Sequence, residues 1–145
     1  MKTFALATLL ALPALAFAQS PAGLWKTIDD ASKKEKSLVR IVEQNGVFTG
    51  RIEKLLDPDA PKDPVCKDCT DDRKDKPIAG MTIIRNVKAS ADDKSTFEGG
   101  EILDPNNGKV YKVRFKLAPD NAKLDVRGYI GTPMLGRTQV WTRVE

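Results

Sequence analysis

The segment 109-KVYKVRFKLAPDNAKLDVRGYI-130 decides the fold of this chain. From Tyr111 to Leu117 its first half alternates strictly between apolar and basic side chains. Its second half repeats the alternation, with Leu124, Val126 and Ile130 sharing one face. A period of two with one apolar and one charged face is typical of antiparallel strands that pack on one side only. The Pro- and Asn-containing stretch 119–122 between the halves favours a turn, so the sequence predicts a β-hairpin here.

The chain on either side of this hairpin has the same organisation. Short β-type runs are broken by turn signals about every ten residues, a spacing typical of all-β domains. Asn45-Gly46 is the strongest of these signals, because both positions of a tight hairpin turn need a positive φ. Only the Pro- and Asp-rich connector 57–77 is long. The runs that we expect to be strands are 23–28, 36–44, 47–55, 80–87, 96–103, 109–117, 124–130 and 138–144.

Eight antiparallel strands joined in sequence close most simply into an up-and-down barrel, which leaves no open edge. We therefore predict an all-β fold, an eight-stranded antiparallel barrel. A two-sheet sandwich is the alternative, but the short links favour the barrel. A barrel of eight strands has an interior that side chains can fill or that can hold one small ligand.

Residues 1–18 have the pattern of a cleaved signal peptide. A positive start at Lys2 precedes an apolar run, and Ala16-Phe17-Ala18 matches an A-x-A cleavage site before Gln19. The apolar run is too short to span a membrane, and no second one follows. We expect a periplasmic or secreted protein, not membrane-spanning, whose residues 19–145 form a single domain.

The composition argues against several classes of function. The formal net charge of the 145 residues is +4, but lysine and arginine are interleaved with aspartate and glutamate, so no nucleic-acid partner is expected. The chain has no histidine, which removes the usual general base and the commonest metal ligand. We expect no catalytic residues, no metal and no cofactor.

The two ends of the predicted barrel carry a pattern similar to lipocalin-like proteins. Gly23 and Trp25 form a G-x-W on the first strand, and Trp141 and Arg143 lie on the last. In those barrels the tryptophan plugs one end and a basic side chain lies across its ring. A cation over an indole contributes about 0.5–2 kcal/mol. We expect these four residues to close the barrel.

A closer resemblance covers nearly all of the mature chain. The motifs "GLW", "DPVCKDC", "GGEILDPNNGKVY", "LDVRGYIGTPMLGRTQVW" and "TR" occur in this order. In these motifs the chain resembles the DUF2147 family of small exported bacterial proteins. The resemblance implies a lipocalin-like (calycin) barrel and the binding of a small apolar or amphipathic molecule.

Cys66 and Cys69 are the most reactive side chains in the sequence. In an exported protein two cysteines usually pair, and we expect a structural disulfide at the tip of the long connector. Redox-active or reactive thiols are one alternative, although no helix or βαβ pattern surrounds them. A metal site is the other, although it would need further ligands from nearby aspartates or a partner chain.

Arg127, Tyr129, Met134 and Arg137 are the candidate ligand-binding residues. In intracellular lipid-binding relatives of the lipocalins, an R-x-Y pair can hold a ligand's carboxylate, and Arg127 and Tyr129 resemble that pair. The period of two instead puts Arg127 on the solvent face. Met134 and Leu135 form an exposed apolar pair at one mouth, and Arg137 starts the last strand beside them.

Three functions remain from the sequence. The first is an envelope binding protein for a small hydrophobic or amphipathic, lipid-like ligand. The second is a protein-interaction or scaffold module with a filled barrel and no ligand. The third is an enzyme of unknown reaction that acts through arginine, tyrosine and carboxylates or through the two cysteines. The sequence favours the first, and the fold-level analogy carries that preference.

Overall fold

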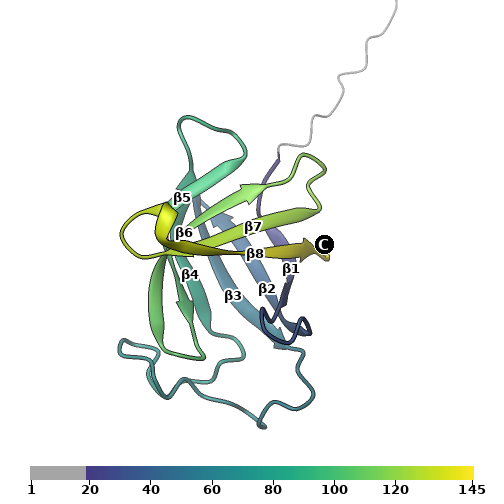
Figure 1. Cartoon of the computed structure of the whole chain (residues 1–145), viewed down its shortest axis with the longest axis vertical. Helices are drawn as coiled ribbons and strands as arrows, with labels where there is room; N and C mark the ends of the chain where they lie inside the picture. Colours follow the sequence, from purple (N-terminus) through teal and green to yellow (C-terminus); the bar gives the residue numbers. More distant parts are fainter. Residues whose placement is uncertain (1–18) are drawn as a thin grey trace, which may run out of the picture.

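The computed structural model describes residues 19–145, which form a closed barrel of eight antiparallel strands (Figure 1). The strands follow one another around the barrel in chain order, which confirms the predicted up-and-down barrel and excludes the sandwich. The expected signal peptide lies outside the described residues. Within residues 19–145, no helix is long and apolar enough to cross a membrane. The strands are β1 Gly23–Ile28, β2 Glu35–Gln44, β3 Val47–Leu55, β4 Thr82–Ala89, β5 Thr96–Asp104, β6 Lys109–Leu117, β7 Lys123–Tyr129 and β8 Gly136–Arg143.

The β6–β7 hairpin shows why the alternating sequence produces this wall. Phe115 pairs with Val126 and Leu117 with Leu124, and all four side chains are buried in the core. The basic side chains between them face outward. Ile130 departs from the prediction, because β7 ends at Tyr129 and Ile130 is 64% exposed in the connection that follows.

The turns also follow the predicted chemistry. Asn45 and Gly46 both have positive φ, 52° and 78°, as a tight turn between β2 and β3 requires. The last strand starts at Gly136, two residues earlier than predicted, because residues 136 and 137 continue the pairing with β7. The remaining connection to β7 contains the short 3-10 turn η1, Pro133–Leu135.

One end of the barrel is closed by the predicted tryptophan and arginine. Trp25 is fully buried, and its Nε1 donates to the carbonyl oxygen of Pro21 at 2.8 Å. The Arg143 guanidinium lies 4.3 Å from the centre of the Trp25 ring. It also donates to the carbonyl oxygens of Ser20, Ala22 and Asn121 at 2.6–2.8 Å. Arg143 thus binds the N-terminal segment and the β6–β7 turn to the plug.

Gly23 is part of the same closure. Its φ is +144°, and a Cβ atom there would lie 2.4 Å from the backbone oxygen of Glu145 and 2.5 Å from Arg143. Only glycine permits both this conformation and this approach. The G-x-W motif therefore has a steric cause: Gly23 makes room for the arginine that lies across Trp25.

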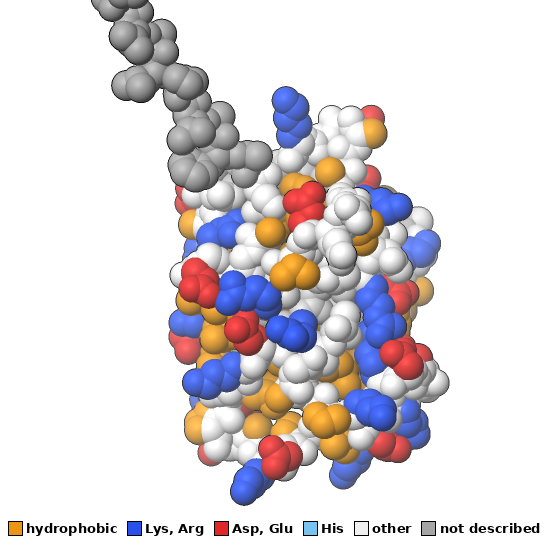
Figure 2. All heavy atoms as spheres, turned by 180° about the vertical axis from the view of Figure 1, so that it is seen from behind, with side chains coloured by type: hydrophobic (Ala, Val, Ile, Leu, Met, Phe, Trp, Pro, Cys, Tyr) orange, Lys and Arg blue, Asp and Glu red, His pale blue; other side chains and the backbone are white. Residues whose placement is uncertain are grey.

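The outer wall of the barrel is mainly polar. Figure 2 shows lysine and arginine interspersed with aspartate and glutamate, as the sequence suggested. Hydrophobic side chains visible in that view gather mainly toward the lower end, where Figure 1 places the long β3–β4 connection. That lower end is opposite the one that Trp25 closes.

Removing the arginine of the plug is expected to be costly. Replacing Arg143 with Ala removes hydrogen bonds to three carbonyls and the contact with the ring, so the free energy of unfolding should fall by about 2–4 kcal/mol. Urea denaturation would measure the fall. The control is Arg51→Ala on the outer face of β3, which should change it by less than about 0.5 kcal/mol. Equal effects of the two variants would contradict the role of Arg143.

Candidate ligand-binding site

The barrel contains a cavity of about 720 Å³ that opens at the end opposite the Trp25 plug. This volume is within the usual range of small-molecule sites, about 300–1,000 Å³. All eight strands contribute residues to its walls, β4 only through Ile83. Its rim comes from the β3–β4, β5–β6 and β7–β8 connections. The apolar side chains that line it include Val39, Ile52, Leu55, Ile78, Ile83, Ile102, Leu103, Val126, Leu135 and Trp141.

The cavity exists because the large side chains are unevenly distributed. Phe48 and Phe97 pack edge to face in the closed half, with ring centroids 5.2 Å apart, and Phe115 is buried near the same end. Toward the mouth, the inward positions hold aliphatic or small residues such as Ile102, Thr27 and Gly128. The phenylalanine rings are therefore gathered in the closed half, while Tyr111 and Trp141 border the cavity itself.

One wall of the cavity carries a chain of hydrogen bonds. The buried Trp141 donates through Nε1 to Oε1 of Gln139 at 3.1 Å. Gln139 Nε2 donates in turn to Oδ2 of Asp30 at 2.9 Å, and Nε of Arg137 lies 3.3 Å from the same oxygen. The chain runs along β8 from the interior to the mouth and ends on the β1–β2 connection. It gives the cavity a polar strip beside its aliphatic walls.

A second polar pair lies on the neighbouring strands. The hydroxyl oxygens of Thr27 and Ser37 are 2.7 Å apart on β1 and β2, and both residues are buried and line the cavity. Among residues 19–145, no buried side-chain nitrogen or oxygen lacks a hydrogen-bond partner. The polar groups of the wall are thus already paired, and the cavity is best suited to a ligand bound mainly by apolar contact.

Charged side chains appear only at the rim. Lys36 and Arg137 contribute positive charge, while Asp57, Asp59 and Asp104 contribute negative charge on other connections. Asp104 also accepts the backbone N–H of Asn106 in its own turn. An amphipathic molecule would place its apolar part inside and its polar part among these groups.

The long β3–β4 connection, residues 56–81, forms a fixed side of the mouth. Cys66 and Cys69 form a disulfide, as expected, and both side chains are buried. The sulfur of Cys66 lies 3.6 Å from the carbonyl oxygen of Pro105 in the β5–β6 turn. Gly108 of that turn has a φ of +71° and packs so closely that a Cβ would lie 2.0 Å from the oxygen of Asp68. Two connections of the mouth are thereby packed together.

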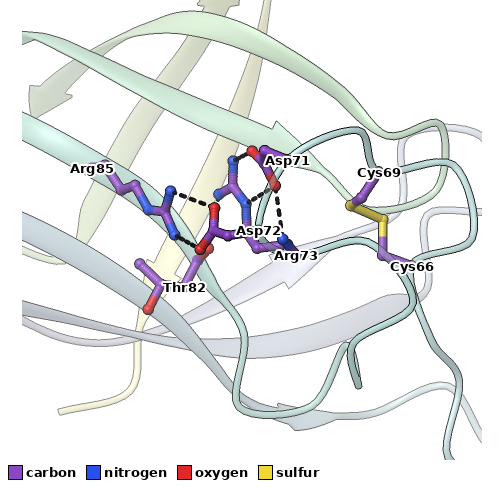
Figure 3. A network of polar contacts seen from close by, with 7 residues as sticks. All are labelled: Cys66, Cys69, Asp71, Asp72, Arg73, Thr82 and Arg85. Carbon is purple, nitrogen blue, oxygen red and sulfur yellow. Dashed lines mark hydrogen bonds and ion pairs between the residues drawn. A yellow bond between two sulfur atoms is a disulfide. The ribbon is translucent and has the colours of Figure 1, made fainter.

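A network of two arginines and two aspartates fixes the same connection to the wall (Figure 3). Arg73 is buried, donates to both carboxylate oxygens of Asp71 and reaches the carbonyl oxygen of Thr82 on β4 at 2.9 Å. Arg85 of β4 pairs with Asp72 at 3.1 Å. Arg73 holds the pKa of Asp71 down, from 3.8 to about 2, through these hydrogen bonds.

The structure separates the four candidate ligand-binding residues. Arg137 projects into the mouth, where it meets Asp30. Tyr129 borders the rim at the end of β7, where its position next to the inward Gly128 directs its side chain to the outer face of the sheet. Arg127 and Met134 do not line the cavity.

Arg127 braces the β7–β8 connection from outside the barrel. Its Nε donates to the carbonyl oxygen of Pro133 at 2.6 Å, and its Nη1 donates to Thr138 at 2.8 Å. The period of two thus gave the correct side for this arginine. The R-x-Y pair of Arg127 and Tyr129 does not point together into the cavity.

Sequence reasoning missed the polar strip. Gln139 and Asp30 are 109 residues apart, and Asp30 belongs to none of the motifs that carry the family resemblance. One signal was available: counting in twos from the buried Trp141 places Gln139 and Arg137 on the inner face of β8. The contact with Asp30 had no such signal. The buried Arg73 was missed as well, because the connector that carries it has no periodicity.

Other chemistry finds little support in the described part of the chain. Over residues 19–145, no group of three or more His, Cys, Asp or Glu side chains could hold a metal ion. Glu98, one of two carboxylates around the Gly99-Gly100 bulge, is paired with Arg114 at 2.9 Å on the outer wall. Both sulfurs are buried in a disulfide, which agrees with an extracytoplasmic location.

Comparison with known proteins places this barrel in a family. The family model described as "Uncharacterized protein conserved in bacteria (DUF2147)" matches residues 23–143, and the chain belongs to this family. No curated protein matches it. Among solved structures, it is similar to a Helicobacter pylori protein, HP1028, described as belonging to the lipocalin family. The TM-score is 0.72 and the identity 22%, over 86% of this chain and 82% of the other. The fold is therefore lipocalin-like.

The network around Arg73 should make stability depend on acidity. The pKa of Asp71 is lower in the folded state, so its contribution is complete above about pH 4 and is lost as pH falls toward about 2. Asp71→Asn should lower the free energy of unfolding at pH 7 and flatten its decline between pH 4 and pH 2. Urea denaturation across this range would measure both effects. Asp125→Asn on the exposed face of β7 is the control, and an Asp71→Asn curve parallel to wild type would contradict this assignment.

Proposed function

We propose that this lipocalin-like member of the DUF2147 family is a binding protein of the cell envelope for a small hydrophobic or amphipathic, lipid-like molecule. The cavity of about 720 Å³ is the observation that carries the proposal. A protein with only a structural or scaffold role has no need of an open interior, and filling it would stabilise the fold. The scaffold alternative assumed a filled barrel, so the cavity favours binding over it.

The chemistry of the lining supports a ligand with one long apolar part. Aliphatic side chains form most of the wall, while the polar strip of Trp141, Gln139 and Asp30 runs along one side. Gln139 has a second amide N–H and a second lone pair, so a ligand hydroxyl or amide could bond to it while Trp141 and Asp30 keep their hydrogen bonds. No fixed cation lies deep in the cavity, because Lys36 and Arg137 are both at the rim. This arrangement favours an uncharged or weakly polar head over a buried carboxylate.

The same proposal includes export and a role without catalysis. Residues 1–18 are proposed to be removed as a signal peptide, leaving residues 19–145 as one periplasmic or secreted domain. The buried disulfide supports an oxidising compartment. The side chains of the polar strip already form hydrogen bonds or ion pairs with one another. The chain has no histidine and no free cysteine that could act as a general base or a nucleophile. Binding is therefore favoured over an enzymatic reaction.

The first test is native mass spectrometry of the protein expressed with its own N-terminus and purified without detergent. We expect a polypeptide mass that begins at Gln19 and lacks the two hydrogens of a reduced cysteine pair. We also expect an additional mass that is lost on collisional activation, because a lipid would bury its apolar part in the cavity. A detergent-free extract of the envelope should restore that mass after delipidation. Its absence in both samples would contradict the binding function.

The second test fills the cavity. A Cβ on Gly128 would point inward, 3.6 Å from Tyr111 and 3.8 Å from Ile102, in ordinary contact. Gly128→Leu should therefore fold and occupy the cavity, and it should weaken binding of the uncharged fluorophore N-phenyl-1-naphthylamine by about tenfold or more. Fluorescence titration would measure the affinity.

The matched control adds the same side chain to the outside of the barrel. Thr49→Leu on the outer face of β3 should leave the affinity within about twofold of wild type. Thermal denaturation of both variants would verify that they fold. Unchanged affinity in a folded Gly128→Leu variant would place the fluorophore outside the cavity and contradict the proposed site.

A further inference from the structure

We propose that the tip of the β7–β8 connection, residues 130–135, docks onto the surface of an anionic lipid bilayer. This surface goes beyond the ligand-binding role, because it requires no ligand in the cavity. It lies at the cavity entrance, since Ile130 and Leu135 also border the cavity. A barrel docked by this tip would hold its mouth against the bilayer.

The first argument is exposure. Ile130, Met134 and Leu135 are 64%, 88% and 74% exposed, more than any other large hydrophobic residue that the structure describes. The remaining exposed hydrophobic residues are valines at 41–50% on the strands and at the C-terminus. Three apolar side chains gathered on one projecting connection mark an interaction site rather than the scattered exposure of an ordinary surface.

The second argument is rigidity. Arg127 donates to the carbonyl oxygen of Pro133 and to Thr138, which holds the connection from the outer face of the barrel. Within the tip, the backbone N–H of Leu135 donates to Thr132 at 3.0 Å. Met134 and Leu135 are thus presented in the short turn η1 before any partner arrives. Docking would require little ordering of the chain.

The third argument is charge. From Val126 to Thr138, around the tip, the sequence contains two arginines, Arg127 and Arg137, and no aspartate or glutamate. Arg137, beside the tip, has a side chain 75% exposed even though it contacts Asp30. Apolar side chains flanked by arginine, with Tyr129 next to them, match the boundary between an anionic headgroup layer and the acyl chains. The acidic residues of the rim lie on other connections, so the barrel would approach with its β7–β8 side.

The small size of the apolar tip favours a bilayer over a protein as its partner. A stable protein interface buries about 800 Å² on each partner, usually from 20–30 residues. The tip offers three apolar side chains on a narrow projection, and the outer faces of β7 and β8 beside it are mixed, with Asp125, Arg127, Thr138 and the half-exposed Val140. A bilayer can accept such a projection without a complementary surface, because its acyl region is fluid and apolar.

Vesicle co-sedimentation tests the proposal. We expect the mature protein to bind vesicles of phosphatidylethanolamine and phosphatidylglycerol, and to bind them at least about fivefold more tightly than vesicles of phosphatidylcholine alone. Met134→Glu should weaken binding to the anionic vesicles by about tenfold or more, because it places a carboxylate at the point of insertion. Met134→Leu should retain binding.

The matched control is Val42→Glu, which adds the same charge to an exposed valine of β2 near the closed end of the barrel. It should leave vesicle binding within about twofold of wild type. Met134 does not line the cavity, so Met134→Glu should also bind N-phenyl-1-naphthylamine as wild type does. The two proposals can therefore fail separately.

Three results would overturn the inference. The first is no binding of the wild type to anionic vesicles. The second is equal loss of binding in Met134→Glu and Val42→Glu, which would indicate a general charge effect. The third is a concentration-dependent dimer in sedimentation velocity that Met134→Glu abolishes, because the tip would then contact a second copy of the chain.

Discussion

The barrel depends on a short seam between its first and last strands. Within the strand ladder, β1 and β8 pair at Trp25 with Arg143 and at Lys26 with Thr142, whereas other neighbouring strands share four to eight pairs. Beyond β8, backbone hydrogen bonds of Leu24 with Val144 and Glu145 extend this seam. So few backbone contacts need support, and the Arg143 side chain supplies it by binding the N-terminal segment and stacking on Trp25. A sheet that did not close here would leave two open edges and no enclosed interior. The cavity therefore depends on the closure of the barrel by Trp25 and Arg143.

The contacts that join β1 and β8 differ between the closed end and the open end of the barrel. In the closed half, β1 and β8 are joined by the backbone. Toward the mouth, the contact passes to side chains, and Asp30 of the β1–β2 connection takes hydrogen bonds from Gln139 and an ion pair from Arg137. Exposed ion pairs contribute little to stability, typically 0–1 kcal/mol. The open half of the seam, which is held by these side-chain contacts, is consequently the weaker half.

The sequence predicted the strands of the barrel better than the side-chain contacts at the opening of the cavity. Strand positions, the Asn45-Gly46 turn and the disulfide follow from local patterns, because a period of two or a short spacing is visible in a few residues. The closure by Trp25 and Arg143 joins opposite ends of the chain, and it was found only because a family resemblance supplied the pairing. Asp30 and Gln139 are also far apart in the sequence, and Asp30 lies outside every motif, so no pattern linked the two residues. The burial of Arg73 could not be predicted for the same reason. Its connection has no periodic pattern, and the arginine is buried because of its contacts with Asp71 and Thr82, which are visible only in the structure.

The mouth has two chemically different sides, and this difference bears on how a ligand would enter. The β3–β4 and β5–β6 connections present Asp57, Asp59 and Asp104 and are held in place by the disulfide and by Arg73. The β7–β8 connection presents apolar side chains instead. Along the second side, an amphipathic molecule would lose contact with water gradually, because apolar surface continues from Met134 past Leu135 to the interior. Along the first, its apolar part would have to cross charged groups, whose desolvation opposes entry. For a ligand of the proposed kind, the residues of the rim would therefore favour entry along the β7–β8 side.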